Sequence, residues 1–251
     1  MPKRYELTVS QWRKIEGVLP GKPGDPGRSG RDNQLFVNGV LWVLRSGAHW
    51  HDLPERYGKW KTVHKRFTRW AEAGVWERVF EHLIKDPDNS YVSLDSSLVR
   101  AHQQAATGKG SRGDQALGHS RGGLTTKIHL ATDALGRPLR IILTPGQRGD
   151  APIAPDLLDG LTPKRVLADK AYDSNAIRAL IRAMRAEPVI PSNPTRKHRI
   201  PYDFEAYKVR NTVERCFNKL KHFRRIATRF DRRAIYFLSF VQIAAAILWM
   251  R

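Results

Sequence analysis

Three acidic residues lie where a carboxylate could take part in chemistry. Asp95 interrupts an apolar segment predicted to be a strand, Asp169 ends the apolar run of residues 166–168, and Glu214 lies in a basic segment predicted to be a helix. An acid within a core strand is costly unless a cation or a metal ion pairs with it, and open sheets place their ligands at the carboxyl ends of strands. Phosphoryl-transfer sites use carboxylates to hold two divalent ions about 3.5–4 Å apart. Each aspartate alone could also be a turn or cap residue.

The basic segment, residues 204–225, predicts one long helix with two different faces. At about 100° per residue, a polar set falls within an arc of roughly 60°, and an apolar set occupies a separate arc that can pack on a sheet. The polar set is Tyr207, Arg210, Glu214 and Lys221, and the apolar set is Val209, Val213, Cys216 and Leu220. An ordinary amphipathic helix would look similar, with Arg210 and Glu214 forming a solvent-exposed i,i+4 ion pair.

The elements that would position these acids change in character near residues 85–90, a turn-rich boundary. Residues 1–88 read as mostly helical, and residues 89–251 read as strands and helices. In the second part, strands are expected at 91–99, on both sides of a tight turn at 133–137, near 164–169 and at 188–193. Helices are expected at 151–161, at 175–185, over the basic segment and after Arg233. This order predicts an α/β domain with a ribonuclease H-like core, a mixed five-stranded sheet with helices on both faces.

The first part predicts a small all-α domain similar to a helix-turn-helix module. Ser10 is expected to cap its first helix, and the segment 20–30 is expected to be a linker or an extended arm. A helix near 61–73 buries a stripe of Val63, Phe67 and Trp70. Its basic residues lie off that stripe and could read a DNA groove: Lys61, Lys65, Arg66 and Arg69. A helical bundle with a solvated basic face explains the same pattern.

Composition favours a polyanionic partner. Among the 251 residues, 44 Lys and Arg outnumber 24 Asp and Glu, which gives a net charge of +20. Nucleic acid is the first candidate partner for a chain with this excess of positive charge. A ribosomal or histone-like protein would share it. Cys216 is the only cysteine, which excludes an internal disulfide and a thiolate zinc cluster. Residues 234–249 are apolar but short for a membrane span, which needs about 20 residues, so a buried helix is expected there.

Several other residues are candidates for DNA contact. The glycine-rich basic segment 108–123, which contains Arg121, is expected to be a loop that orders on DNA, or simply a disordered surface loop. Lys127 follows it. A dense basic run continues from the long helix and could track a DNA backbone: Lys219, Lys221, Arg224, Arg225, Arg229, Arg232 and Arg233. Asp150 and Asp173 are expected to cap helices, with a smaller chance that Asp173 touches a metal ion.

The pattern Tyr-x2-Arg-x3-Glu-x6-Lys, which begins at Tyr207, resembles the signature of DDE transposases of bacterial insertion sequences. It is carried by the insertion-sequence-four and -five superfamily. The context of Asp95, SLDSSLVRAH, and that of Asp169, LADKAYDS, resemble the two aspartate regions of the insertion-sequence-five family. Residues 118–139 resemble the block between these regions, and LTVSQWRKIEGVLP resembles the N-terminal opening. The resemblance covers nearly the whole chain.

This resemblance implies that Asp95, Asp169 and Glu214 bind two Mg²⁺ or Mn²⁺ ions. It also implies that Tyr207, Arg210 and Lys221 contact the transposon end. Without a cation, two carboxylates 4 Å apart repel by about 4 kcal/mol at an effective dielectric of about 20. We therefore expect the acids to be incompletely ordered, or to hold a proton, until metal binds.

The resulting hypothesis is a DNA transposase that binds terminal inverted repeats, cuts the 3′ ends and joins them to target DNA. It would be a bacterial cytoplasmic, nucleoid-associated protein, and synapsis of two ends implies at least a homodimer. Two alternatives remain: a ribonuclease H-like nuclease without strand transfer, and a DNA-binding protein that descends from a transposase without its catalysis.

Overall fold

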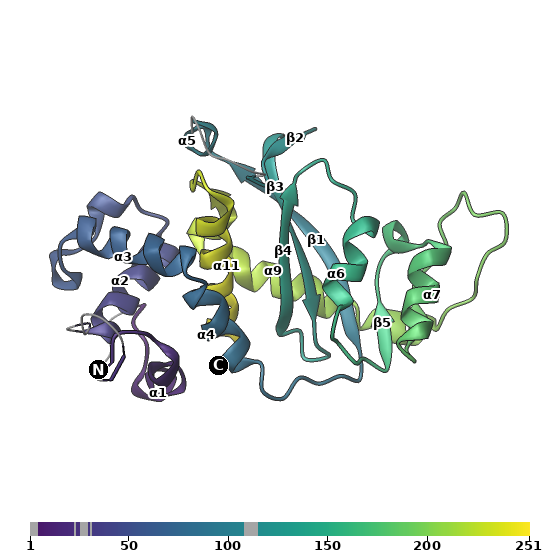
Figure 1. Ribbon diagram of the computed structural model, residues 1–251. Coiled ribbons are helices and arrows are strands. Elements are labelled where there is room, and N and C mark those ends of the chain that lie inside the picture. The colour runs from purple at the N-terminus through teal and green to yellow at the C-terminus, as the bar shows by residue number, and fades with distance from the viewer. Residues whose placement is uncertain (1–4, 23, 26–29, 31, 108–114) are drawn as a thin grey trace. The chain divides into compact units, whose positions relative to one another are not determined.

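The computed structural model describes residues 5–22, 24–25, 30, 32–107 and 115–251 (Figure 1). The chain forms two compact units. Unit 1 contains residues 1–85, 101–115 and 220–251, and unit 2 contains residues 86–100 and 116–219. These units differ in extent from the two expected domains, 1–88 and 89–251, which remain a prediction.

Unit 1 is mostly helical, as expected. Its α-helices are α1 (Val9–Ile15), α2 (Asn33–Ser46), α3 (Trp60–Glu72), α4 (Val75–Leu83), α5 (Gln103–Ala106), α10 (Arg224–Ala227) and α11 (Ala234–Trp249). Short 3₁₀ turns occur at η1 (Glu16–Val18), η2 (Trp50–Asp52) and η3 (Glu55–Tyr57), and β7 (Thr228–Arg229) is a two-residue strand.

One predicted helix cap in unit 1 is wrong. Thr8, and not Ser10, caps α1, because the Thr8 hydroxyl accepts the Gln11 N–H while the Gln11 side chain accepts the Thr8 N–H. This reciprocal pair satisfies two N–H groups that the helix leaves unpaired. Asp32 caps α2, which ends at Gly47 in the left-handed conformation, φ 71°. Glycine takes this conformation at little cost.

Aromatic side chains form much of the core of unit 1. The expected stripe Val63, Phe67 and Trp70 is buried on α3. Phe67 stacks on Phe240 of α11 with 4.5 Å between ring centroids, which ties the two helices together. Helix α11 is almost wholly buried, as predicted. Within the described ranges, no helix is long and apolar enough to cross a membrane.

A mixed sheet is the centre of unit 2. Its strands are β1 (Val92–Ala101, whose last residue belongs to unit 1), β2 (Gly118–Ser120), β3 (Gly123–Thr132), β4 (Pro138–Pro145), β5 (Arg165–Leu167) and β6 (Glu187–Val189). The order is β2-β3-β1-β5-β6, and β4 also pairs with β3. β1, β3 and β4 are antiparallel, and β5 and β6 run parallel to β1. This arrangement confirms the predicted ribonuclease H-like class, with the short β2 in addition to five main strands.

Helices cover both faces of this sheet. Figure 1 shows α6 (Ala154–Leu158) in front of the sheet and α9 (Asn211–Lys221) behind it. The turn between β3 and β4 requires Gly136, whose φ is 73°, and a Cβ there would lie 3.0 Å from the Thr212 carbonyl oxygen of α9. The turn therefore packs directly on the helix that carries Glu214. Unit 2 also contains η4 (Ala151–Ile153), η5 (Lys170–Tyr172), α7 (Asn175–Ala183) and α8 (Phe204–Lys208).

The predicted single helix over residues 204–225 is wrong. The segment forms α8, α9 and α10, with a break at Val209 and Arg210. At this break the Arg210 N–H donates to Tyr207 and the Val213 N–H donates to Arg210, both to the carbonyl three residues earlier. Such i→i+3 bonds tighten a helix end, so Tyr207 and Glu214 do not share one helical face. The apolar set is nevertheless buried at Val213, Cys216 and Leu220.

Candidate active site

Asp95 lies in the middle of β1, paired with Leu130 of β3. The side chain is 18% exposed, so it is mostly removed from water. One carboxylate oxygen accepts the N–H of Ser96 at 2.8 Å. A carboxylate in this position retains unused acceptor capacity, which a cation could satisfy.

Arg210 supplies such a cation from the break between α8 and α9. Its guanidinium lies 3.5 Å from Asp95 Oδ2 and 2.6 Å from Glu214 Oε1. The sequence predicted the pair with Glu214 as one alternative, whereas the contact with Asp95 was not anticipated. Arg210 therefore bridges two of the three expected catalytic acids.

The acid strength of Asp95 reflects this environment. Burial raises its pKa from 3.8 to about 6, although the Arg210 guanidinium and the Ser96 N–H oppose the rise, and the charges of Asp169 and Glu214 add to it. Asp169 and Glu214 are thus close enough for their charge to act on Asp95. The raised pKa favours the protonated form of Asp95, and the expectation that the acids hold a proton until metal binds stays a prediction.

Asp169 directly follows β5, the strand that pairs with β1 in parallel. Its Oδ1 accepts the Ala171 N–H at 2.8 Å, so the side chain caps η5. The cap role and the predicted position at the end of a strand therefore coexist. Asp169 Oδ2 accepts no hydrogen bond from the described residues, so it has lone pairs with which to bind a cation.

The acids are not gathered in a metal-binding geometry. In the part of the chain with described side chains, no three His, Cys, Asp or Glu residues are placed to hold an ion. The donor set still suits a divalent metal, because carboxylate oxygens are the ligands that hard cations prefer. Two buried polar atoms beside it, Tyr172 Oη and Arg210 Nε, lack hydrogen-bond partners among the described residues. Such atoms could contact a hydrated ion or a phosphate.

Tyr172 was not singled out from the sequence. Its ring is 1% exposed, and burial raises the pKa of its hydroxyl, with smaller contributions from the charges of Asp150, Asp95 and Asp169. A tyrosine three residues after Asp169, at the end of a tight turn, was the available signal. The hydroxyl stays protonated over the physiological range and can donate a hydrogen bond toward the acids.

Asp150 and Lys127 form a separate network on the sheet. Asp150 stands at the N-cap position of η4 but makes no cap hydrogen bond, so the predicted cap is wrong. Instead, its Oδ1 accepts from Ser96 Oγ and from Lys127 Nζ, both at 2.8 Å. Lys127 also donates to the Arg148 carbonyl and is only 13% exposed. Lys127 is therefore occupied within the fold, which argues against its predicted contact with DNA.

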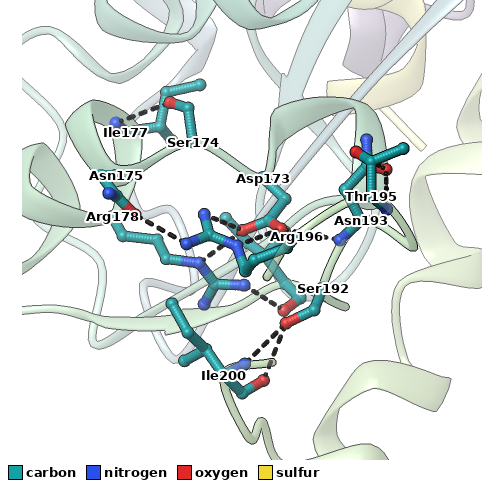
Figure 2. Close-up of polar contacts among 11 residues, drawn as sticks. Asp173, Ser174, Asn175, Ile177, Arg178, Ser192, Asn193, Thr195, Arg196 and Ile200 are labelled. Atoms are coloured by element: carbon teal, nitrogen blue, oxygen red, sulfur yellow. Dashed lines mark hydrogen bonds and ion pairs between the residues drawn. The ribbon is translucent and has the colours of Figure 1, made fainter. Parts of the chain in front are cut away.

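Asp173 does not cap α7. Ser174 caps α7, and the fully buried Asp173 carboxylate binds Arg178 and Arg196 (Figure 2). Burial alone would raise its pKa, but hydrogen bonds from Arg196, the Asn193 N–H and Arg178 lower it to about 2. Both oxygens are fully used, so the sequence-based possibility of metal contact finds no support.

The helix expected to read DNA presents some of its basic residues to solvent. Lys61, Lys65 and Arg69 are exposed on α3. Arg66 is half-buried, with its guanidinium over the rings of Phe36 and Trp70 and hydrogen-bonded to Asn33. Three of the four predicted residues thus remain available for a phosphate, and Arg66 serves the packing of unit 1.

The basic residues that follow α9 also include both exposed and buried side chains. Arg225 is buried, with Nη2 at 3.0 Å from Asp231 Oδ1, and Arg229 is fully buried. The prediction that Arg225 contacts DNA is therefore corrected, as is the continuous track through Arg229. Arg224 is exposed, and Arg121 is exposed between β2 and β3. Residues 108–114 of the glycine-rich segment lie outside the described residues.

The other two predicted end-binding residues are half-buried. Tyr207 packs against a core of Leu167, Val189 and Ala206, with the Arg210 guanidinium 5.9 Å from its ring centroid. Lys221 ends α9. Tyr207 thus packs between the core of unit 2 and the Arg210 guanidinium.

Two family models match the chain. One, described as "Putative transposase of IS4/5 family", matches residues 7–80. The other, described as "Transposase DDE domain", matches residues 86–249. Together they cover both the helical N-terminal region and all three candidate acids.

Curated relatives carry similar names. A "Putative transposase for insertion sequence element IS6501" of Brucella ovis is 45% identical over 130 residues, which is 51% of this chain and 100% of that protein. A "Putative transposase for insertion sequence element IS402" of Burkholderia cepacia is 34% identical over 135 residues, 49% of this chain and 62% of that protein.

Solved structures with a related arrangement include two transposases in complex with DNA. The piggyBac synaptic complex aligns with a TM-score of 0.44 and 12% identity, over 75% of this chain and 48% of that one. The Mos1 paired-end complex aligns with a TM-score of 0.29 and 13% identity, over 82% and 80%. At scores below 0.5, neither likeness bears on the site.

Proposed function

We propose, because this chain belongs to the DDE transposase family, that Asp95, Asp169 and Glu214 form the site at which transposon DNA is cut and joined. The enzyme binds the terminal inverted repeats of its insertion sequence. It hydrolyses the phosphodiester at each 3′ end and joins the freed end to target DNA by transesterification. Synapsis of two ends requires at least two protomers.

The shared contact of Asp95 and Glu214 with Arg210 is the observation that supports this site most directly. Residues from a strand and from a separate helix meet at one guanidinium, and the charge of Asp169 acts on the same carboxyl group. Strongly perturbed acids of this kind are more frequent at functional sites than elsewhere. A purely structural ion pair would not need two acids from separate elements at one arginine, with a third acid near them.

The acids would hold two Mg²⁺ or Mn²⁺ ions, which when bound supply the charge that activates a water and stabilises the leaving oxygen. Asp95 must be deprotonated to serve as a ligand, so metal binding has to overcome its raised pKa. Arg210 must also release the two carboxylates. The freed guanidinium can then pair with a DNA phosphate, which is the role that the sequence resemblance implies for it.

DNA contacts elsewhere come from exposed cations. Lys61, Lys65 and Arg69 on α3 fit a duplex backbone, as do Arg121 and Arg224. Such contacts position the duplex without reading its sequence. Binding should therefore weaken steeply as ionic strength rises.

The test compares wild type with Glu214→Gln on duplexes that carry the element's own ends. Cleavage should be lost in the variant, whereas end binding should remain within about tenfold, because the amide keeps the size of the side chain and removes its charge. Glu205→Gln is the matched control, since Glu205 is an exposed glutamate on α8 whose one ion pair among the described residues is with Lys208. It should cleave normally.

Pre-cut ends separate transposase from nuclease. Joined products with target DNA are expected from wild type. Nicked DNA without joined products would favour the nuclease alternative, and cleavage that persists in Glu214→Gln would mean that the acids are wrongly assigned.

A further inference from the structure

A loop rich in proline and positive charge connects β6 to α8. We call residues 191–201 the basic loop. Its sequence, PSNPTRKHRIP, contains prolines at both ends and at position 194, and four consecutive basic residues at positions 196–199. Prolines restrict the conformations of the unfolded chain and so lower the entropy lost when the loop is ordered.

Arg196, the first of the four basic residues, points into the protein. Its Nε and Nη2 donate to the two oxygens of Asp173, both at 2.9 Å, and its Nη1 donates to Asn175 Oδ1 at 2.7 Å. Figure 2 shows this bidentate pair and the Asn175 contact. The fork geometry fixes the direction of the arginine as well as its position.

Both oxygens of the Asp173 carboxylate, which anchors the loop, accept hydrogen bonds. Besides Arg196, the Asp173 carboxylate accepts Arg178 Nε at 2.8 Å and the Asn193 N–H at 2.7 Å. Arg178, also buried, donates to the Ile190 carbonyl just before the loop. Breaking a buried ion pair of this kind leaves an uncompensated charge, so the loop is strongly held at its start.

The two ends of the loop are also tied together. Ser192 Oγ accepts the Ile200 N–H at 2.8 Å and donates to the Ile200 carbonyl at 3.1 Å. Together with Tyr202, residues of the loop, Arg199 among them, line an open hollow of about 560 Å³.

The tip carries cations that the fold does not use. Lys197 and Arg199 are exposed, and neither has an acidic partner within the described part of the molecule. The acids that follow the loop are already paired: Asp203 lies 3.6 Å from Arg165, and Glu205 lies 2.7 Å from Lys208. The fold thus uses one basic residue as an anchor and leaves the next cations free in solvent.

The loop emerges at the edge of the sheet where the candidate active site lies. β5 and β6 are parallel neighbours; Asp169 follows β5 and the loop follows β6. The short turn η5 alone separates Asp169 from Asp173 in the chain. The anchor of the loop is therefore connected directly to a proposed catalytic acid.

We infer that the basic loop binds the phosphate backbone of the DNA duplex being cut, through Lys197 and Arg199, and that the Arg196–Asp173 pair holds it ready to do so. This inference rests on the proposed function for the identity of the duplex. Cations on an ordered loop lose less entropy on binding than cations on a flexible one. An ordinary surface loop would not need a buried, fully hydrogen-bonded carboxylate beneath it.

The experiment measures binding of a fluorescein-labelled random-sequence duplex and of a duplex from the element's end, at several salt concentrations. Lys197→Gln with Arg199→Gln should weaken binding to both on the order of tenfold or more. The slope of log affinity against log salt should fall by about 1.8, because each phosphate contact contributes about 0.9. Cleavage of the end duplex should fall in parallel at subsaturating protein.

The matched control is Lys164→Gln with Arg182→Gln. These exposed residues lie before β5 and in the last turn of α7, toward the end of β5 and β6 opposite to the one from which the loop emerges, and the double variant loses the same charge. Its affinity should stay within about threefold of wild type, with a slope reduced by less than about 0.5. Arg196→Gln should weaken binding by an intermediate factor, because the tip cations remain but their support is lost.

The outcomes separate this inference from the proposed function. If the loop variant binds and cleaves like wild type while wild type is active, the inference is wrong and the function stands. If wild type fails to cleave but the loop variant still loses affinity and slope, the phosphate contact of the loop stands and the proposed function fails. Equal losses in the loop variant and in the control would show only a net-charge effect and would overturn the inference.

Discussion

Asp95 and Asp173 are both largely buried aspartates that contact arginine, yet their pKa values are shifted in opposite directions. The pKa of Asp95 is raised to about 6, and that of Asp173 is lowered to about 2. Asp173 accepts four hydrogen bonds over two oxygens, three of them from arginine side chains. Asp95 has one backbone donor and a guanidinium at 3.5 Å, near two further acids. Burial with full compensation makes a structural anchor, and burial with partial compensation leaves a group that can bind a ligand.

Removing the compensated acid should have the largest effect on stability. Asp173→Ala leaves Arg178 buried without its partner, and we expect the free energy of unfolding to fall by about 3–5 kcal/mol. Urea unfolding followed by circular dichroism measures this. Asp159→Ala, at an exposed acid, should change it by less than about 0.5 kcal/mol. Similar small losses in both variants would contradict the anchor role.

The free energy of unfolding should change with pH in opposite directions for Asp95 and Asp173. Because the folded pKa of Asp95 is raised, its contribution is fully present below pH 3.8 and is lost as pH rises to about 6, by about 3 kcal/mol. Because the folded pKa of Asp173 is lowered, its contribution is present above pH 3.8 and is lost as pH falls to about 2, by roughly 2 kcal/mol.

Unfolding free energies measured across this range test both slopes. In Asp95→Asn the loss between pH 4 and pH 6 should disappear, while the acid-side loss remains. An unchanged profile in that variant would mean that Asp95 is not the group that titrates.

Metal binding should reduce the difference in charge compensation between Asp95 and Asp173. Mg²⁺ at about ten times its dissociation constant should stabilise wild type by about 1.4 kcal/mol, because it replaces Arg210 as the partner of Asp95. Calorimetry of Mg²⁺ binding and thermal unfolding both measure this. Asp95→Asn should lose the response, and Asp159→Asn should keep it. Equal metal uptake in wild type and Asp95→Asn would contradict the proposed ligand set.

The smallest effect on stability is expected at Glu214. Its pair with Arg210 is an i,i+4 contact to a side chain that is 57% exposed, and such pairs contribute a few tenths of a kcal/mol. Glu214→Gln should therefore change the unfolding free energy by less than about 0.5 kcal/mol, as measured by urea unfolding. A loss of several kcal/mol would make the residue structural, and a loss of cleavage in that variant would then no longer identify a catalytic group.

Much of the fold could be predicted because the relevant patterns are local. Apolar segments located the strands around Asp95 and Asp169, and helical periodicity located the buried stripe of α3. The break at Val209 and Arg210 was not predictable from periodicity, because the apolar positions on both sides still fit one continuous helix. Tertiary packing of Tyr207 against Leu167 and Val189 favours the broken form.

The sequence by itself determined which residue types are present and which elements carry them: acids at two strands and in a helix, and an excess of cations along the chain. Only the tertiary structure decided the partner of each charge. Arg210 reaches Asp95, Arg225 is buried against Asp231, and Arg196 joins Asp173 from 23 residues away. The physical reason is that an ion pair depends on which distant segments the sheet and helices bring together, and residue spacing along the chain does not contain that information.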